Sequence, residues 1–210
     1  MYKYLSEKYF QEIMDYGSIK IGTLYDFRRQ EHLDGIRDEE EGVKELFKNY
    51  DGKHTIEGGP SGRDLMGAIS VGAGATLAFE DVSLVNKVSS PDLFVFCLSS
   101  RCSKDVMSEF DGAEKCYEVV NVRNFFKRIT ASLGTVVPVR FRGVFPCKYG
   151  LRREEWNGVD YGLDPALMKG PDYSGQFEVR AIWEPRVEAE IEPQIFEARS
   201  LRKYVKEVYV

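Results

Sequence analysis

The chain has 210 residues, 43% of them hydrophobic, which excludes general disorder and a collagen-like structure. Its 29 basic and 34 acidic residues give a net charge of −5, and this balance does not indicate a nucleic-acid-binding protein. Four cysteines without CxxC spacing and only two histidines make a zinc site unexpected. Because no apolar run could span a membrane and the first residues lack an apolar signal core, we expect a soluble, cytoplasmic protein with free thiols.

The chain opens with the pattern of a strand, a helix and a second strand. Residues 2–5 predict the first strand, and Ser6 is a suitable N-cap for a helix that runs to Met14 on apolar positions at helical spacing. Gly17 is expected to end that helix, because glycine readily adopts the left-handed conformation. Residues 19–21 then alternate like a strand.

Two later segments lack such a pattern. Residues 30–41 are polar and acidic, which predicts a solvated loop or helix face. Residues 52–74 contain seven glycines, which predict a loop-rich and mobile region. That region contains no GxxxxGK[ST] motif and no GxGxxG motif after a strand, so a nucleotide-binding loop is not expected there.

The remaining pattern predicts more strands than helices. Residues 93–98 form a continuous apolar run that is typical of a central buried strand, and Cys97 within it is interpreted as a small buried hydrophobe. Further strands are predicted over residues 77–88, 117–122, two stretches of 136–149 broken at Gly143, 177–183, and between Pro185 and Pro193; helices are predicted over 103–110, 124–133 and after Ser200. Strands and helices do not alternate regularly, so we predict an α+β fold. We expect one domain over residues 1–210, with a central mostly antiparallel or mixed sheet and short flanking helices.

Three polar segments on the predicted strands are candidates for a functional site. Residues 2–4 read Tyr-Lys-Tyr on the opening strand, and residues 98–100 read Leu-Ser-Ser at the end of the buried strand. Residues 176–180 read Gln-Phe-Glu-Val-Arg, and a strand period of two puts Gln176 and Glu178 on one face.

The order of these segments resembles the ADP-ribosyltransferase superfamily. In that superfamily an opening strand carries Arg or His, a middle strand ends in a Ser-Thr-Ser-like motif, and a late strand carries Gln/Glu-x-Glu. The matching positions here are Lys3, Ser99 with Ser100, and Gln176 with Glu178. Lysine replaces the expected Arg or His, and Ser-Ser shortens the three-residue motif. The chain also looks like a widespread bacterial domain family of uncharacterised function, which shows an opening Tyr-Lys-Tyr, an apolar strand ending in Ser and a late Glu-Val-Arg strand.

The superfamily resemblance implies an NAD-dependent ADP-ribosyltransferase-like enzyme that uses NAD as substrate, needs no metal and modifies an unidentified acceptor. Glu178 would stabilise the positive charge that develops on the ribose, and Gln176 would orient the acceptor. Lys3 would contact the pyrophosphate, and Ser99 would hold the ribose side of the cleft. The residues expected to bind NAD are Lys3, Tyr4, Ser99 and Ser100. If this holds, Lys3, Ser99 and Glu178 line one pocket on adjacent strands.

Other interpretations of the same residues stay open. The scaffold could serve as a non-enzymatic module that binds a nucleotide or a nucleotide-derived signal, and the lysine at position 3 favours this reading. The chain could also be a protein-interaction domain that uses the acidic residues 34–41. In structural terms, Glu178 and Arg180 would then form only a surface ion pair, the two serines would only end a strand, and Lys3 would be solvated.

Overall fold

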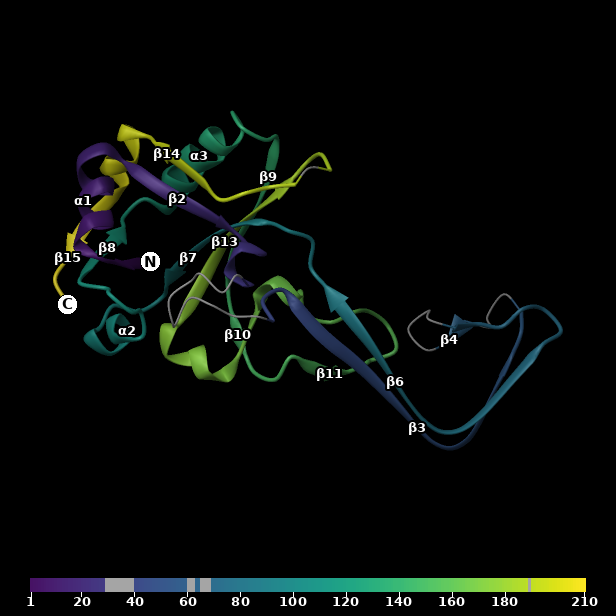
Figure 1. Ribbon diagram of the computed structural model, residues 1–210. Helices are drawn as coiled ribbons and strands as arrows, with labels where there is room; N and C mark the ends of the chain where they lie inside the picture. The colour runs from purple at the N-terminus through teal and green to yellow at the C-terminus, as the bar shows by residue number, and fades with distance from the viewer. Residues whose placement is uncertain (29–39, 60–62, 65–68, 189) are drawn as a thin grey trace. The chain divides into compact units, whose positions relative to one another are not determined.

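The computed structural model describes residues 1–28, 40–59, 63–64, 69–188 and 190–210. It has an α+β fold in which a large antiparallel sheet is accompanied by a smaller mixed sheet and a few short helices (Figure 1), so the predicted fold class is confirmed. Its internal contacts divide the chain into two compact units. The first comprises residues 1–42, 91–150 and 166–210, and the second comprises residues 43–90 and 151–165. The interpretation of the chain as one domain stays a prediction.

The first unit contains the eight-stranded sheet and the α-helices. Its strands in this sheet are β1 (Tyr2–Leu5), β2 (Ser18–Thr23), β7 (Phe94–Ser99), β8 (Lys115–Val119), β9 (Val139–Pro146), β13 (Glu178–Pro185), β14 (Gln194–Glu197) and β15 (Val205–Val208). Its helices are α1 (Glu7–Tyr16), α2 (Lys104–Ser108) and α3 (Val122–Leu133). Two short strands, β10 (Lys148–Tyr149) and β12 (Met168–Lys169), pair with each other in parallel. Short 3₁₀ helices cover Asp26–Arg28, Pro165–Leu167, Pro171–Gln176 and Arg199–Tyr204.

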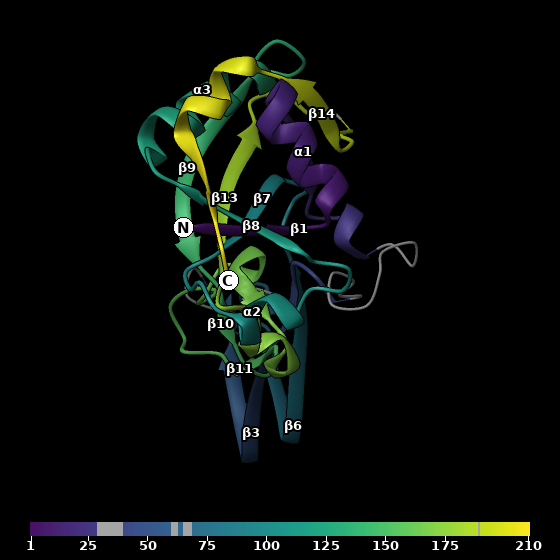
Figure 2. The ribbon, with the colours of Figure 1, turned by 90° about the vertical axis from the view of Figure 1, so that its left-hand side faces the viewer.

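Strand β7 is the centre of this sheet, because β1, β2 and β13 all pair with it in antiparallel fashion. Figure 2 shows β7, β1 and β13 in the middle of the unit, with α1 and α3 above them. The apolar core includes Phe96 and Trp183 from the sheet and Phe125, Phe126 and Ile129 from α3, as the helical spacing predicted. The buried central strand and the inward face of α3 are therefore both as expected.

Several boundaries follow the local sequence signals. Gly17 adopts the left-handed conformation with φ of 68° and ends α1, as expected. The Ser103 side chain accepts a hydrogen bond from the backbone N–H of Val106 and caps α2. The predicted break at Gly143 does not occur, because β9 is one continuous strand there. Gly143 has φ of 138° and lies opposite Ile182 of β13, where the register between the two strands is irregular.

The expectations for the last segment were wrong in two places. The strand predicted between Pro185 and Pro193 instead begins at Gln194, as β14, which pairs with β2. The helix predicted after Ser200 is a 3₁₀ turn that gives way to β15, which pairs with β8. Pairing satisfies backbone groups along the edge of β8, and this tertiary gain overrides the local helical pattern.

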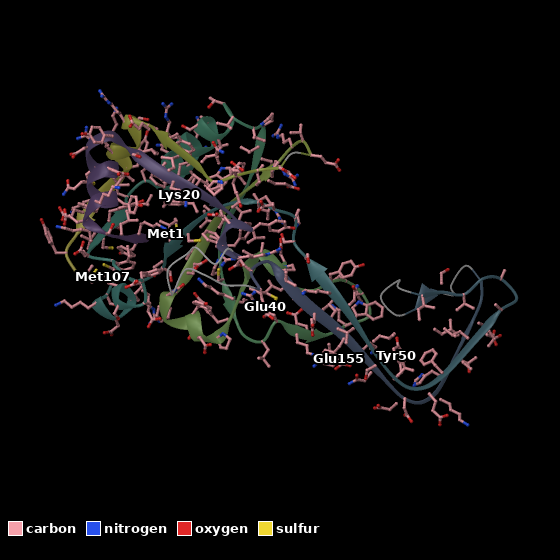
Figure 3. The ribbon with its side chains drawn as sticks, viewed as in Figure 1. Met1, Lys20, Glu40, Tyr50, Met107 and Glu155 are labelled. Atoms are coloured by element: carbon pink, nitrogen blue, oxygen red, sulfur yellow. The ribbon has the colours of Figure 1, made fainter. Side chains whose placement is uncertain are left out.

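The second unit is a three-stranded sheet of β3 (Val43–Glu57), β6 (Thr76–Ser89) and β11 (Arg153–Glu155). Tyr50 on β3 and Glu155 on β11 are labelled in Figure 3. The sequence did not predict β3, because charged residues interrupt its pattern and its register with β6 shifts between Tyr50 and Lys53. Strands β4 (Arg63–Asp64) and β5 (Ile69–Ser70) pair within the glycine-rich region. The mobility of that region stays a prediction.

Candidate functional site

Strand β7 changes its partner along one edge, and the candidate site lies at this change. Strand β13 pairs with β7 along its whole length, so β1 and β2 must share the opposite edge. Strand β2 pairs with residues 94–95, whereas β1 pairs with Ser99. Neither β1 nor β2 pairs with the intervening residues 96–98, so β1 and β2 diverge there. Lys3 of β1 extends between them, and its Nζ donates a hydrogen bond to the Cys97 carbonyl at 2.8 Å.

A cavity of about 570 Å³ opens at this divergence, entirely within the first unit. This volume falls within the range of roughly 300–1,000 Å³ that ligand pockets occupy. Its charged lining comprises Lys3, Glu12, Lys20, Asp26, Glu41, Asp111, Lys169, Glu178 and Arg180, and Gln176 adds a polar amide. We call the connected group of Glu41, Lys169, Gln176, Glu178 and Arg180 the floor of the cavity. Its aromatic lining includes Tyr4, Tyr9, Phe27, Phe96 and Phe110. The cavity therefore combines a polar floor with apolar walls, as small-molecule sites commonly do.

Glu178 begins β13, and both of its carboxylate oxygens accept hydrogen bonds from cations. Oε2 lies 2.6 Å from Nζ of Lys169, and Oε1 lies 2.5 Å from Nε of Arg180. The backbone N–H of Glu178 donates to the hydroxyl of Tyr149, and the thiol of Cys147 lies 3.6 Å from Oε1. Glu178 is only 4% exposed, so the interpretation of Glu178 and Arg180 as a surface ion pair was wrong.

Arg180 joins Glu178 to a second carboxylate, that of Glu41. Its Nη1 and Nη2 lie 2.5 and 3.0 Å from the two oxygens of Glu41, and its Nη1 also donates to the Ala166 carbonyl at 2.6 Å. Arg180 and Glu41 are each 1% exposed. A fork-to-fork pair of this kind is among the strongest that side chains form, and it fixes the guanidinium behind Glu178.

These contacts determine the protonation states of Glu178 and Lys169. Burial alone would raise the pKa of Glu178, but the charges of Arg180 and Lys169 outweigh it and hold the pKa of this carboxyl well below its usual range. Burial would lower the pKa of Lys169, but Glu178 raises it above its ordinary value. At neutral pH the floor therefore contains an ionised carboxylate in contact with an ammonium and a guanidinium.

Lys3 differs from Lys169, because its ammonium contacts no carboxylate in the part of the chain that is described. Its Nζ donates to the Cys97 carbonyl and lies 5.0 Å from the centre of the Phe96 ring. Burial lowers the pKa of Lys3, while the negative charge of Glu178 opposes that change. Lys3 is half-buried and its ammonium bonds a backbone carbonyl beside the cavity, so it is not the freely solvated lysine of the alternative interpretation.

The two serines have structural contacts. The Ser99 hydroxyl donates to the Gln176 carbonyl at 2.8 Å and accepts from the Arg101 backbone N–H, and Ser99 is 1% exposed. The Ser100 hydroxyl donates to the Phe177 carbonyl. Neither serine lines the cavity, so the expectation that Ser99 shares one pocket with Lys3 and Glu178 was wrong. Ser99 instead lies opposite Glu178 in the sheet register.

Gln176 lines the cavity, but it lies on a 3₁₀ helix and not on the strand that the sequence predicted. The period-two argument put it on the same strand as Glu178, but residues 171–176 form a 3₁₀ helix and Phe177 has a φ of 46°. The left-handed conformation of Phe177 still leaves Gln176 close to Glu178, and Lys169 connects the two side chains. The Oε1 of Gln176 accepts a hydrogen bond from Nζ of Lys169 at 2.7 Å, and the same ammonium donates to Glu178. Tyr4, which was expected to bind NAD, lines the cavity and stacks on Phe110 with ring centres 5.6 Å apart; its role in binding stays a prediction.

The sequence reasoning missed Lys169 and Glu41, and it placed no role on Tyr149. Lys169 lies on a two-residue strand and carries no motif, and Glu41 was counted with an acidic solvated segment. Residues 30–39 of that segment lie outside the described residues. Cys97 is half-buried and lines the cavity, so it is less buried than the sequence indicated. The surrounding protein raises the pKa of its thiol to about 12, which makes it a poor nucleophile, as expected.

In the described ranges, no group of three or more His, Cys, Asp or Glu residues could hold a metal ion. No helix in those ranges has both the length and the apolar character needed to cross a membrane. No protein-family model matches the chain, and no curated protein or solved structure is significantly similar to it.

Proposed function

We propose that the cavity of the first unit binds NAD and that the chain is an ADP-ribosyltransferase-like enzyme. The supporting observation is that Lys3, Gln176 and Glu178, taken from the segments whose order resembles that superfamily, line one cavity. Ser99, from the second of the three segments, lies opposite Glu178 in the sheet register and donates to the Gln176 carbonyl, but it does not line the cavity. Residues so far apart in the sequence meet here on β1, β7 and β13.

The chemistry requires an ionised carboxylate near the ribose. The bond between nicotinamide and the ribose C1′ breaks, its electron pair leaves with nicotinamide, and the ribose acquires oxocarbenium character. A nucleophile of the acceptor then bonds to C1′ and loses its proton. Glu178 stabilises the developing positive charge, because Arg180 and Lys169 keep its carboxyl ionised at neutral pH.

The polar and aromatic lining suits the other parts of a dinucleotide. The ammonium of Lys3 has hydrogen-bond donors for the pyrophosphate, although it lacks the forked geometry of an arginine. The stacked pair of Tyr4 and Phe110 provides a flat apolar wall for a ring. A cytoplasmic location belongs to the same proposal, because all four cysteines are free and a reducing compartment keeps thiols in that form.

A second candidate function, nucleotide binding without transfer, is favoured by the ion pairs of Glu178. Both of its oxygens already contact cations, at 2.5 and 2.6 Å. A carboxylate whose charge is balanced in this way stabilises a ribosyl cation less than a free one would. In this case the chain recognises a nucleotide or a nucleotide-derived signal and leaves its glycosidic bond intact.

Two measurements on the full chain separate these functions. Incubation with NAD followed by quantification of free nicotinamide reports transfer or hydrolysis, and a melting curve with and without NAD reports binding. Nicotinamide release together with a higher melting temperature supports the enzyme. A higher melting temperature without release supports the binding module. If NAD causes neither nicotinamide release nor a higher melting temperature, both proposals are contradicted.

A further inference from the structure

Two of the four free cysteines, Cys102 and Cys116, have their thiols in contact. Cys116 of β8 is opposite Tyr4 of β1 in the sheet register, so these two side chains lie on one face of the sheet. The Tyr4 hydroxyl donates to the Arg101 carbonyl at 2.9 Å and accepts from the Ser103 N–H at 3.0 Å. Because these two residues flank Cys102, Tyr4 brings Cys102 to Cys116, and the two thiols hydrogen-bond to each other.

The two thiols differ in their access to solvent. Cys102 is half-buried, whereas Cys116 is 1% exposed and packs with Tyr4 and Val106 in an apolar cluster. Burial raises the pKa of Cys116 to about 12, and the neighbouring Cys102 adds to this shift, so Cys116 remains a thiol at neutral pH. A small oxidant in solution therefore reacts first with Cys102, and Cys116 is in place to react with the product.

The other two cysteines do not form such a pair. Cys97 of β7 is opposite Arg180 of β13, and the N–H of Cys147, which directly follows β9, donates to the Glu178 carbonyl of β13. Strand β13 therefore lies between the two cysteines, and two strand spacings separate their backbones by roughly 9–10 Å. A disulfide requires Cα atoms within about 4.4–6.8 Å of each other. The contact between Cys102 and Cys116 is thus a specific feature of this pair.

The chain between Cys102 and Cys116 forms part of the cavity wall. Residues 110–113 line the cavity, and Phe110 stacks on Tyr4. Helix α2 lies in the same stretch, and its Met107, labelled in Figure 3, packs against the cluster that contains Cys116. We call residues 103–115 the wall segment. A bond between Cys102 and Cys116 would join its two ends and restrict its opening.

We propose that Cys102 and Cys116 are a site of reversible oxidation by hydroperoxides, and that the resulting disulfide holds the wall segment closed. The Cys102 sulfur attacks one oxygen of hydrogen peroxide, the O–O bond breaks, and the other oxygen leaves with the thiol proton as water. The Cys116 sulfur then attacks the sulfenic acid of Cys102. The S–S bond forms, the S–O bond breaks, and the hydroxyl group leaves with the proton of Cys116 as a second water. The two sulfurs together lose two electrons, and the peroxide gains them.

The test begins with treatment of the full chain with hydrogen peroxide, blocking of the remaining thiols, and digestion without reductant. We expect mass spectrometry to find the peptide of Cys102 joined to that of Cys116, lighter by two hydrogen atoms than the separate peptides, and dithiothreitol to release them. Amide hydrogen exchange in the wall segment should slow by about tenfold or more in the oxidised chain, because the cross-link restricts local opening.

Variants assign both effects to the pair. Cys102→Ala and Cys116→Ala each remove one partner and are expected to abolish the joined peptides and the slower exchange. Cys147→Ala, which removes a buried thiol outside the pair, is the matched control and is expected to retain both effects. Melting curves establish that each variant is folded. If Cys116→Ala does not fold, Cys102→Ala, at the half-buried position, still decides the test.

The outcomes are distinct. Joined peptides together with slower exchange support the proposal. If Cys102 is recovered unlinked, overoxidised to a sulfinic acid or bound to a second copy of the chain, the proposed disulfide is overturned. Joined peptides with unchanged exchange overturn the assigned effect on the wall segment. None of these readouts depends on NAD, so the proposed function stands or fails separately.

Discussion

Strand β6 and the first residues of β13, 178–181, both alternate along the chain, yet their side chains differ in exposure to solvent. On β6, exposed residues such as Glu80 and Ser83 alternate with half-buried apolar ones such as Phe79 and Leu84. On β13, Glu178 and Arg180 are 4% and 1% exposed, and the apolar residues between and after them are buried too. The same period of two therefore accompanies a solvated face in one strand and a buried charge network in the other.

The difference teaches that an alternating pattern gives the spacing of side chains and not their surroundings. A charge on the exposed face of β6 needs no specific partner, because water solvates it. A charge on β13 needs partners, and Glu178 and Arg180 find them in Lys169 and Glu41. Buried charges that need several distant partners are costly to maintain, which makes such a cluster a candidate functional site.

The largest expected effect comes from removing the cation that joins the network. Arg180→Ala leaves the carboxylates of Glu41 and Glu178 buried without their shared partner, and we expect the free energy of unfolding to fall by about 3–5 kcal/mol. The matched variant on β6 is Lys87→Ala, which removes an exposed cation opposite Glu45 and is expected to cost at most about 1 kcal/mol. Urea unfolding followed by circular dichroism measures both; similar costs would remove the contrast between the strands.

The network also predicts a dependence of stability on acid. The pKa of Glu178 in the folded chain lies below its ordinary value of 4.5, so its stabilising contribution is complete above about pH 5. As the pH falls below 4.5, the unfolded chain takes up the proton first, and the free energy of unfolding decreases by up to about 1.4 kcal/mol per pH unit for this one group.

Glu178→Gln removes this contribution, so its unfolding free energy should decrease less steeply than that of the wild type between pH 4.5 and pH 3. The control on β6 is Glu80→Gln, which replaces an exposed carboxylate and is expected to retain the wild-type slope. Urea titrations at a series of pH values give the slopes. An identical slope for Glu178→Gln and the wild type would mean that Glu178 is not held ionised by its neighbours.

A smaller effect tests the apolar positions of the same two strands. Val179→Thr on β13 introduces a hydroxyl at a site that is 8% exposed, and we expect a loss of about 1–3 kcal/mol. Val85→Thr on β6 makes the same change at a site that is 54% exposed, where we expect a change within about 0.5 kcal/mol. Melting temperatures of the two variants would coincide if burial did not distinguish the strands.

The sequence predicted the features whose signals are local. Gly17 ends a helix because of its own conformational freedom. Residues 93–98 supply most of the central strand because every side chain in that run is apolar, and all of them except the half-buried Cys97 are buried. The strand β3 was missed because its charged residues and register shift hide the alternation. The α+β class followed from the balance of strands and helices, which errors at single boundaries do not alter.

The site was only partly predictable for a related reason. Lys3, Gln176 and Glu178 were recognised through short motifs, and all three line the cavity. The partner of Arg180, by contrast, is Glu41, which lies 139 positions away in the sequence, and no local pattern marks that pairing. The 3₁₀ turn before Glu178 was missed because the left-handed conformation occurs at Phe177, a residue that rarely adopts it.

The most direct test of the account is the nicotinamide released from NAD by Glu178→Gln. The amide keeps the shape of the side chain and removes its charge, so we predict a loss of at least about 100-fold in turnover with NAD affinity largely retained. The control is Glu184→Gln on the same strand, whose carboxylate pairs with the exposed Arg140; its turnover should stay within about twofold of the wild type. Unchanged turnover in a folded Glu178→Gln protein would contradict the central claim.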